Sequence, residues 1–339
     1  MPFWKRKATK KSAKPNVKEL ALEGKQSETL GSSSIRFSNE SQADLPRMVP
    51  QSFSMAAEPE QQLKPVPKVI HHFWQGKFDP LKQHISNLNK IADTNSEYTT
   101  VLHVLFDNPK DINALQPKVP NILVKDMRNE AWFTNFQASP RYQQFKASRE
   151  GGRPHLASGA DIIKTELIYA EGGIWNDVDN KPLEQLPTEL RVEALSILTA
   201  GPTEFKRWDN ILGVHSSTFG TYRGNPILKT INDSSYKKYS NLQHIIYQNH
   251  PDTNDPDNHF KMISETAGSL HFSTELKAHM EGFNLELNEL HKSKGKSNDR
   301  RIIMDKYFAP TTTTGAGDLD EDQLIKLMQN LSPSGHVVI

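Results

Sequence analysis

Cysteine is absent from the 339-residue sequence. This absence excludes disulfides, zinc–thiolate sites and thiol nucleophiles, so any metal ion must be held by oxygen or imidazole ligands. Long apolar runs are missing as well, since no segment approaches the roughly 20 residues that a membrane-spanning helix needs. The basic N-terminus is not followed by the apolar stretch of a secretory signal. We therefore expect a soluble, cytoplasmic chain.

Neither sign of charge dominates, because 41 Lys and Arg residues face 40 Asp and Glu residues. This balance argues against a nucleic-acid binder, whose affinity would come from neutralising phosphates. The basic charge is concentrated in residues 1–14, which carry six Lys or Arg and no acid. Such a start could serve peripheral contact with an anionic membrane, a nuclear-localisation-like address or solubility, and solubility is the commonest use.

The composition divides the chain into two parts. Residues 1–64 are rich in Ser, Gln, Glu and Lys with few large apolar residues. Such a segment buries too little apolar surface to offset the entropy lost on ordering. We predict a disordered basic tail at 1–64 and one folded domain at 65–339, which is long enough to bury a sizeable core.

The folded part begins with a strand–helix–strand pattern. Residues 68–76 have the apolar character of a buried strand ended by glycine, residues 81–92 have helical periodicity, and residues 100–106 predict a second strand. This order predicts a parallel βαβ unit, and therefore an α/β fold with a doubly wound, mostly parallel sheet. Further elements are expected as helical structure at 110–150, a helix feeding a strand at 156–178, strands at 195–198 and 211–214, a helix from Asn225, and a helix at 320–329.

Two carboxylates, Asp177 and Asp179, flank Val178 at the end of an apolar run. If residues 174–179 form a strand, both carboxylates stand on one face while Val178 points into the core. Such a pair suits Mg or Mn, and an ion held there can neutralise a diphosphate. The alternative is a solvated turn, because acids after a strand are common.

A second acid, Asp161, lies sixteen residues before Asp177, and Lys164 follows it by three. On a helix these two side chains share a face and would point outward together. However, Ser158 and Asp161 also fit a capping box at a helix N-terminus, and the residue pattern alone favours the cap.

Three side chains of the first strand are weaker candidates. His71 and His72 could ligate a metal ion, but histidines in a strand are more often core or edge residues. Trp74 is more often a packing residue than a platform for a base, although an aromatic side chain at a strand end can be both.

Residues 67–76 (PKVIHHFWQG) and 157–179 together resemble the DXD-containing glycosyltransferases. The similarity is to the catalytic domain of the large clostridial glucosylating toxins and to the related sugar-transferase family that includes yeast initiating mannosyltransferases. The spacing from Asp161 to the pair Asp177 and Asp179 is the one those families show. Residues 264–270 are similar to the family's Thr/Ser-Gly-Pro segment, with Ala-Gly-Ser in place of Gly-Pro.

The resemblance implies a GT-A fold, a UDP-sugar donor, a Mn or Mg ion, and transfer of the sugar to an acceptor hydroxyl with retention of configuration. It implies that Asp179 binds the metal directly and that Asp177 contacts the ribose or a metal-bound water. Asp161 would hydrogen-bond the donor sugar, and Trp74 would line the uridine pocket.

Two further positions follow from the same resemblance. Lys164 stands where the family has an arginine, so a point charge replaces a bidentate fork at the donor site. The family closes its site with a C-terminal loop, and His336 is the metal ligand that this loop offers here.

The resemblance also suggests an effector or toxin, delivered into a host cell, that modifies a protein acceptor. Four alternatives stay open: a sugar transferase of envelope polysaccharide synthesis, a nucleotidyl or phosphoryl transferase, a glycoside hydrolase, and an inactive binding module.

Overall fold

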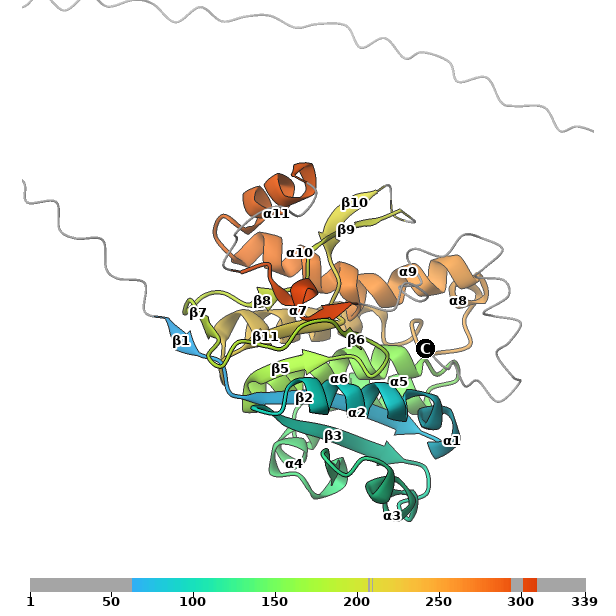
Figure 1. Cartoon of the computed structure of the whole chain (residues 1–339). Helices are drawn as coiled ribbons and strands as arrows, with labels where there is room; N and C mark the ends of the chain where they lie inside the picture. The colour runs from blue at the N-terminus through green and yellow to red at the C-terminus, as the bar shows by residue number, and fades with distance from the viewer. Residues whose placement is uncertain (1–62, 207, 209, 294–300, 310–339) are drawn as a thin grey trace, which may run out of the picture. The chain divides into compact units, whose positions relative to one another are not determined.

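The computed structural model describes residues 63–206, 208, 210–293 and 301–309 (Figure 1). They belong to one compact unit, Ala56–Ile339. Of the tail expected at 1–64, all but the last two residues lie outside the described ranges, as do His336 and the helix expected at 320–329. These remain predictions.

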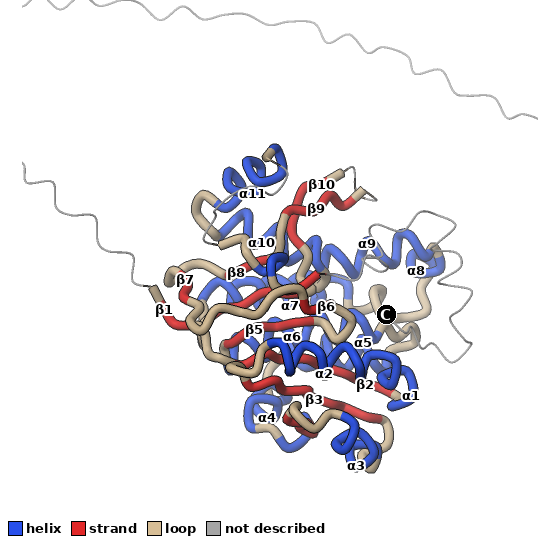
Figure 2. Tube along the Cα trace, in the orientation of Figure 1, coloured by secondary structure: helices blue, strands red, loops and turns tan. Residues whose placement is uncertain are grey.

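The centre of the unit is a six-stranded sheet of strand order β4-β3-β2-β5-β11-β8 (Figures 1 and 2). The first four strands in this order are parallel, and β11 runs antiparallel to both of its neighbours. The bounds are β2 Val69–Gly76, β3 Thr99–Phe106, β4 Leu123–Asp126, β5 Gly173–Asn176, β8 Leu198–Thr199 and β11 Thr218–Thr221. The predicted α/β class with a mostly parallel sheet is confirmed.

The predicted βαβ unit is formed by β2, a helical connection and β3. The connection comprises α1 (Phe78–Leu81), the short η1 (Lys82–His84) and α2 (Ile85–Thr94). The two strands pair in parallel from Val69 opposite Thr99 to Gly76 opposite Phe106. Both strands are almost entirely buried, as expected for parallel strands covered on both faces.

Helices cover both faces of the sheet (Figure 2). On one face Leu102 and Val104 of β3 belong to the same apolar cluster as Leu88 of α2. On the other face Phe73 and Leu105 pack with α4 (Ala131–Gln137), α5 (Arg141–Glu150) and α6 (Leu156–Glu171). Alternate residues along each strand therefore serve opposite layers, as the strand period of two requires.

Some local predictions were wrong. The region 110–150, expected to be helical throughout, contains the strand β4 between α3 (Asp111–Leu115), η2 (Gln116–Lys118) and η3 (Met127–Asn129). β4 is a four-residue edge strand in which Leu123 is exposed, so it has too little apolar pattern to be distinguished. Of the strand expected at 195–198 only Leu198 is in β8, whereas β10 (Ile211–Val214) and the helix after Asn225 are confirmed.

The remaining elements complete the unit around the sheet. The helices are α7 Pro226–Leu242, α8 Pro251–Asn254, α9 Pro256–Thr266, α10 Ser269–His279, α11 Phe283–Lys292 and the short η4 Met304–Lys306. The remaining strands form three two-stranded sheets. In these sheets β1 (Lys64–Pro65) pairs with β7 (Arg191–Val192), β9 (Pro202–Phe205) pairs with β10, and β6 (Lys181–Pro182) pairs with β12 (Phe308–Ala309). Among the described helices, none is both long enough and apolar enough to cross a bilayer.

Candidate active site

The candidate site lies where β5 ends. The strand stops at Asn176, so Asp177 follows it and Asp179 lies in the next turn, not in a continuing strand as predicted. The Asp177 backbone N–H donates to the Ser217 carbonyl oxygen at 2.8 Å, which fixes this residue against the segment before β11. The chain then turns, and the Asn180 backbone N–H donates to the Asp177 carbonyl oxygen at 3.2 Å. Val178 is buried, as predicted. A turn, and not strand alternation, therefore presents the two carboxylates.

Helix α2 holds this turn in place. The Asn87 side chain donates from Nδ2 to the carbonyl oxygens of Val178 at 3.0 Å and Asn180 at 2.6 Å. Asn180 is itself buried and donates from its side chain to the Ser217 carbonyl oxygen at 3.0 Å. Because three elements share these bonds, the turn is a fixed part of the fold and not a loose loop.

Asp177 is short of compensating positive charge. Its Oδ1 accepts a hydrogen bond from Trp175 Nε1 at 2.7 Å. Burial raises the pKa of Asp177 to about 7, Lys164 opposes this rise, and neighbouring Asp179 adds to it. A cation placed beside the two carboxylates would relieve both the burial and the repulsion.

Asp161 and Lys164 of α6 meet as their spacing predicts, with Lys164 Nζ 2.5 Å from Asp161 Oδ1. The expectation that they point outward was wrong, because Lys164 is only 4% exposed. Burial works against the ammonium, but Asp161, Asp177 and Asp179 together raise the pKa of Lys164. The buried ammonium of Lys164 thus contacts Asp161 and lies near enough to Asp177 and Asp179 to experience their charge.

The capping box expected at Ser158 and Asp161 is not formed. Helix α6 begins at Leu156, and its N-cap is His155, whose Nδ1 accepts from the Ser158 backbone N–H at 3.1 Å. The Ser158 hydroxyl instead hydrogen-bonds the Tyr247 hydroxyl at 2.5 Å. Asp161 therefore lies beyond the first turn, and its carboxylate is available to the site.

The segment 264–270 reaches the same place from the C-terminal half. Gly268 separates α9 from α10, and a Cβ added to it would lie 3.5 Å from Asp161 Oδ2. Ser269 Oγ accepts from the Ser216 backbone N–H at 3.2 Å, one residue before the carbonyl that fixes the turn. In the sequence, only the family resemblance indicated that this segment belongs to the site.

Trp74 lies at the end of β2, partly buried, and its Nε1 donates to the Lys77 carbonyl oxygen at 2.9 Å. Its ring centroid is 5.7 Å from that of His84. Burial lowers the pKa of His84, and the charge of Asp179 opposes this shift. Trp74 and His84 therefore line the approach to the turn. His84 was missed, because a single histidine in a short helical turn carries no signal.

His71 and His72 are core residues, as the sequence favoured. Both are buried in the sheet, and His71 Nδ1 lies 3.0 Å from His103 Nε2 of the neighbouring strand. His103 in turn lies 2.6 Å from a Glu130 carboxylate oxygen. These contacts lie inside the sheet, so neither histidine is positioned beside Asp177 and Asp179.

The donor set fits a magnesium or manganese ion in part. Within the described ranges, no group of three or more His, Asp or Glu side chains is placed to enclose a metal ion. Asp177 and Asp179 offer two carboxylates, and Mg²⁺ is commonly bound by one or two carboxylates together with substrate phosphates and water. His336, proposed as a further ligand, lies outside the described residues.

Comparison with known proteins gives a short sequence match and a likeness of fold. No family model matches the chain. A segment of 122 residues, 34% of the chain, is 25% identical to toxin Afp18 of Yersinia ruckeri and spans 6% of that toxin's length. The structure resembles the PaToxG glycosyltransferase with a TM-score of 0.53 and 15% identity, over 78% of this chain and 84% of that one.

A second solved structure, the catalytic domain of alpha-toxin from Clostridium novyi, gives a TM-score of 0.49 and 12% identity over 79% of this chain and 83% of that chain. The likeness to the PaToxG glycosyltransferase confirms the expected fold, a GT-A type α/β domain with helices on both faces of the sheet.

Proposed function

We propose that this chain is a metal-dependent retaining glycosyltransferase that moves a sugar from a UDP-sugar to a hydroxyl group of a protein. One observation carries the proposal: Asp161, Asp177 and Asp179 meet around Lys164 at the carboxyl end of a parallel strand. In open α/β sheets, ligands bind outside the carboxyl ends of the strands. The likeness to a glycosyltransferase structure also supports the proposal of glycosyl transfer.

Each residue has a separate task in this proposal. Asp177 and Asp179 would hold a Mn or Mg ion, which would supply the positive charge that a departing diphosphate requires. Lys164 fixes the orientation of Asp161 through their 2.5 Å contact. Asp161 accepts hydrogen bonds from hydroxyl groups of the donor sugar, and Trp74 lies beside the uridine.

Two of the groups around the carboxylates are shielded from bulk water. Lys164 and Trp175 are buried, and the turn that carries the two aspartates is held by Asn87. Exclusion of water strengthens the attraction between charged groups and the donor phosphates.

The toxin similarity supports a protein acceptor and an effector role. It covers a third of the chain, and the toxin named is far longer than the matched segment. A sugar transferase of envelope polysaccharide synthesis is the alternative that keeps the same donor chemistry.

The decisive experiment is release of UDP from a panel of UDP-sugars in the presence of Mn. We expect Asp179→Asn to lower the rate on the order of 100-fold, because charge stabilisation at a transition state is commonly worth that much. EDTA should have the same effect. The control is Asp233→Asn, which removes an exposed carboxylate of α7 paired with Lys229. If Asp179→Asn and EDTA both leave the rate unchanged, the metal role is wrong.

The rival enzymes give different results in the same experiment. A nucleotidyl transferase turns over nucleoside triphosphates and leaves UDP-sugars intact. A glycoside hydrolase cleaves a plain glycan in the presence of EDTA. An inactive binding module releases no UDP, and calorimetry with UDP then shows no heat that depends on Mn.

A further inference from the structure

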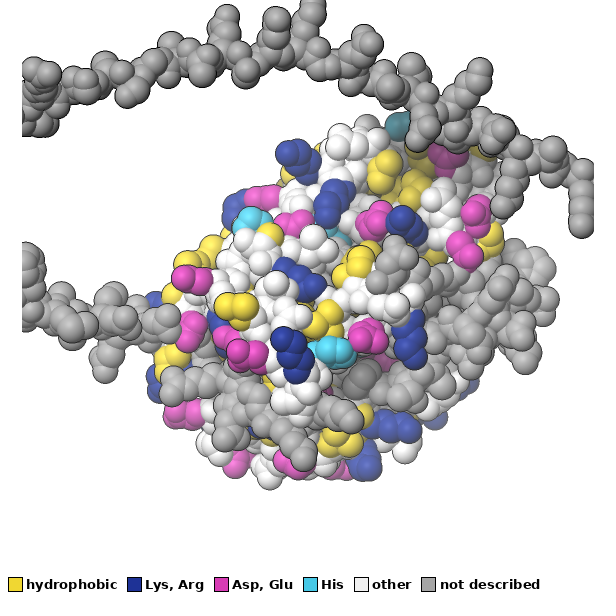
Figure 3. Space-filling view, turned by 90° about the horizontal axis from the view of Figure 1, so that it is seen from above, with side chains coloured by type: hydrophobic (Ala, Val, Ile, Leu, Met, Phe, Trp, Pro, Cys, Tyr) yellow, Lys and Arg dark blue, Asp and Glu magenta, His cyan; other side chains and the backbone are white. Residues whose placement is uncertain are grey.

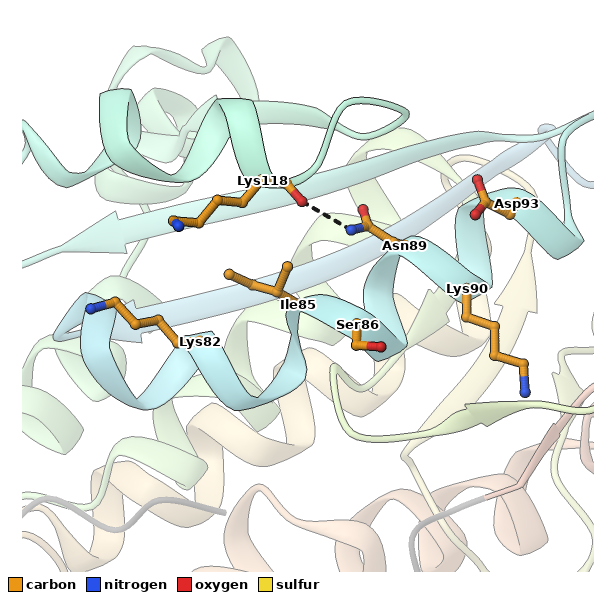
Figure 4. A pocket seen from close by; sticks show the side chains of 7 residues that line it. All are labelled: Lys82, Ile85, Ser86, Asn89, Lys90, Asp93 and Lys118. Carbon is orange, nitrogen blue, oxygen red and sulfur yellow. Dashed lines mark hydrogen bonds between the residues drawn. The ribbon is translucent and has the colours of Figure 1, made fainter.

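A surface groove of about 670 Å³ runs along α2, next to the candidate site (Figure 4). Three lysines line it, with apolar Ile85 and polar Asn89 between them and Asp93 at one end. The lysines are Lys82, Lys90 and Lys118. The site proposed above uses none of these residues.

The groove begins beside the strand tip. Ile85 and Ser86, which line the groove, lie in the sequence between His84 and Asn87. His84 experiences the charge of Asp179, and the Asn87 side chain donates to the Val178 carbonyl oxygen in the turn of the candidate site. Because α2 connects two parallel strands, its N-terminal end lies at the carboxyl edge of the sheet. Figure 4 shows the side chains of Lys82 and Lys118 reaching toward that end of the groove, whereas Asp93 lies at the other end.

The charges of the groove favour an anionic occupant. Lys90 and Lys118 take part in none of the ion pairs found among the described residues, and Lys82 pairs only with the exposed Asp79. Exposed pairs of this kind are worth about 0–1 kcal/mol, so a stronger partner displaces them easily. The Asp93 carboxylate already accepts a hydrogen bond from Asn121 Nδ2 at 2.8 Å. The groove as a whole therefore carries more positive than negative charge.

We infer that this groove binds an acidic segment of the acceptor protein and thereby brings its hydroxyl group to the strand tip. The inference rests on the proposed function and adds the class of acceptor. Complementary charge speeds encounter and selects among partners, and Ile85 provides an apolar contact for a side chain of the bound segment. The donor diphosphate has its own place at Asp177 and Asp179, so the groove is left for the acceptor.

The test compares two reactions of the full chain in Mn: UDP release from a UDP-sugar without acceptor, and sugar transfer to the proteins of a lysate followed by mass spectrometry. We expect Lys90→Glu/Lys118→Glu to lower transfer about 10-fold and to leave UDP release within about two-fold, because like charge repels an acidic partner. The matched control, Lys237→Glu/Lys261→Glu, makes the same charge change on α7 and α9 and should affect neither reaction.

Poly-glutamate serves as a defined probe of the groove. It should inhibit transfer by the wild type at low salt, inhibit the groove variant far less, and leave UDP release unchanged in both. Equal loss of transfer and UDP release in Lys90→Glu/Lys118→Glu would assign the groove to the donor and overturn the inference. Unchanged transfer and unchanged inhibition by poly-glutamate would overturn it as well.

One competing occupant is the chain's own acidic run Asp318, Asp320, Glu321 and Asp322. If neutral substitutions there raise transfer by the wild type but not by the groove variant, the groove holds this run and the acceptor inference is wrong. Absence of UDP release from every UDP-sugar, by contrast, refutes the proposed function itself.

Discussion

Lys164 interacts electrostatically with all three aspartates of the candidate site. It is buried, contacts Asp161 directly, and experiences Asp177 and Asp179. Removing one partner of a buried ion pair leaves the other charge uncompensated, which is far more costly than the pair is favourable. The lysine therefore has a structural task, whereas its contact with the donor stays a prediction of the resemblance.

We predict that Lys164→Met lowers the free energy of unfolding by about 3 kcal/mol, because it leaves Asp161 buried without its partner. Urea denaturation at pH 7 measures this. Adding Asp161→Asn should recover part of the loss, since the unpaired charge is then gone. Lys261→Met is the control, because its partner Glu265 is exposed. A loss in Lys164→Met no larger than that of Lys261→Met would contradict the argument.

Gly159 shows why a glycine lies within the second turn of α6. A Cβ at this position would lie 2.7 Å from Gln75 Nε2 and 3.0 Å from Ser148 Oγ. Gln75 uses that same nitrogen to donate to the Leu156 carbonyl oxygen at 2.6 Å. The glycine therefore lets the end of β2 approach the start of α6.

Gly159→Ala should lower the free energy of unfolding by about 1–3 kcal/mol, because overpacking outweighs the better helix propensity of alanine. Combining it with Gln75→Ala should remove the clash, so the double variant should lose less than the sum of the two single changes. Thermal unfolding of the four proteins measures the coupling. A stabilised Gly159→Ala variant would show that Gln75 moves aside freely.

At the scale of elements, the sequence predicts what is long and locally patterned. β2, β3 and α6 were predicted because each contains a long apolar run or a helical period. β4, β9 and β11 are four-residue strands whose identity depends on neighbours distant in the chain. Their local pattern could not reveal them.

In the candidate site, too, some features could be predicted from the sequence and others depend on contacts between distant parts of the chain. Asp161, Asp177 and Asp179 follow from spacing and resemblance, and the structure brings them together. The turn after Asn176 does not follow from sequence, because it depends on the carbonyl oxygen of Ser217, about 40 residues away. Gly268 is further still, so its approach to Asp161 is a property of the whole fold.

The pairing of β2 with β3 buries three histidines, His71, His72 and His103. Burial lowers the pKa of His72 from 6.5 to about 4. When the pKa of a histidine is lower in the folded state than in the unfolded state, the histidine does not change the free energy of unfolding at a pH above its unfolded pKa. It removes stability as the pH falls from there toward the folded pKa, because only the unfolded chain takes up the proton.

We therefore expect the free energy of unfolding to fall between pH 7.5 and pH 4, with His72 alone contributing roughly 3 kcal/mol. Urea denaturation across this range measures the slope. His72→Leu should flatten the slope, and its effect at pH 7.5 reports packing separately. An unchanged slope in His72→Leu would mean that His72 does not carry the acid sensitivity.

At the scale of the whole molecule, the even balance of charge in the composition is also seen on the surface of the described residues. On the face shown in Figure 3, the described Lys and Arg side chains alternate with Asp and Glu side chains, with no extended area of one sign. Recognition at the groove along α2 then depends on a few lysines placed beside the site.

Among the described residues, Val66 is the first apolar residue that the fold buries. Val66 is 5% exposed, shares a cluster with Ile70 and Leu190, and donates from its backbone N–H to the Leu190 carbonyl oxygen at 2.9 Å. Just before it, β1 pairs Lys64 with Val192. The domain therefore needs the chain from about this point onward.

A chain that starts at residue 63 should keep the melting temperature and the UDP-sugar hydrolysis of the full chain. A chain that starts at residue 68 loses β1 and Val66, which is worth about 2 kcal/mol and lowers the melting temperature by roughly 4–8 °C. Differential scanning calorimetry of the two truncations makes the comparison, and adding residues 64–67 back to the shorter chain should remove the difference. Should removal of residues 1–62 alone cost as much as removal of residues 1–67, the tail would be part of the stable unit, and the boundary predicted from composition would be wrong.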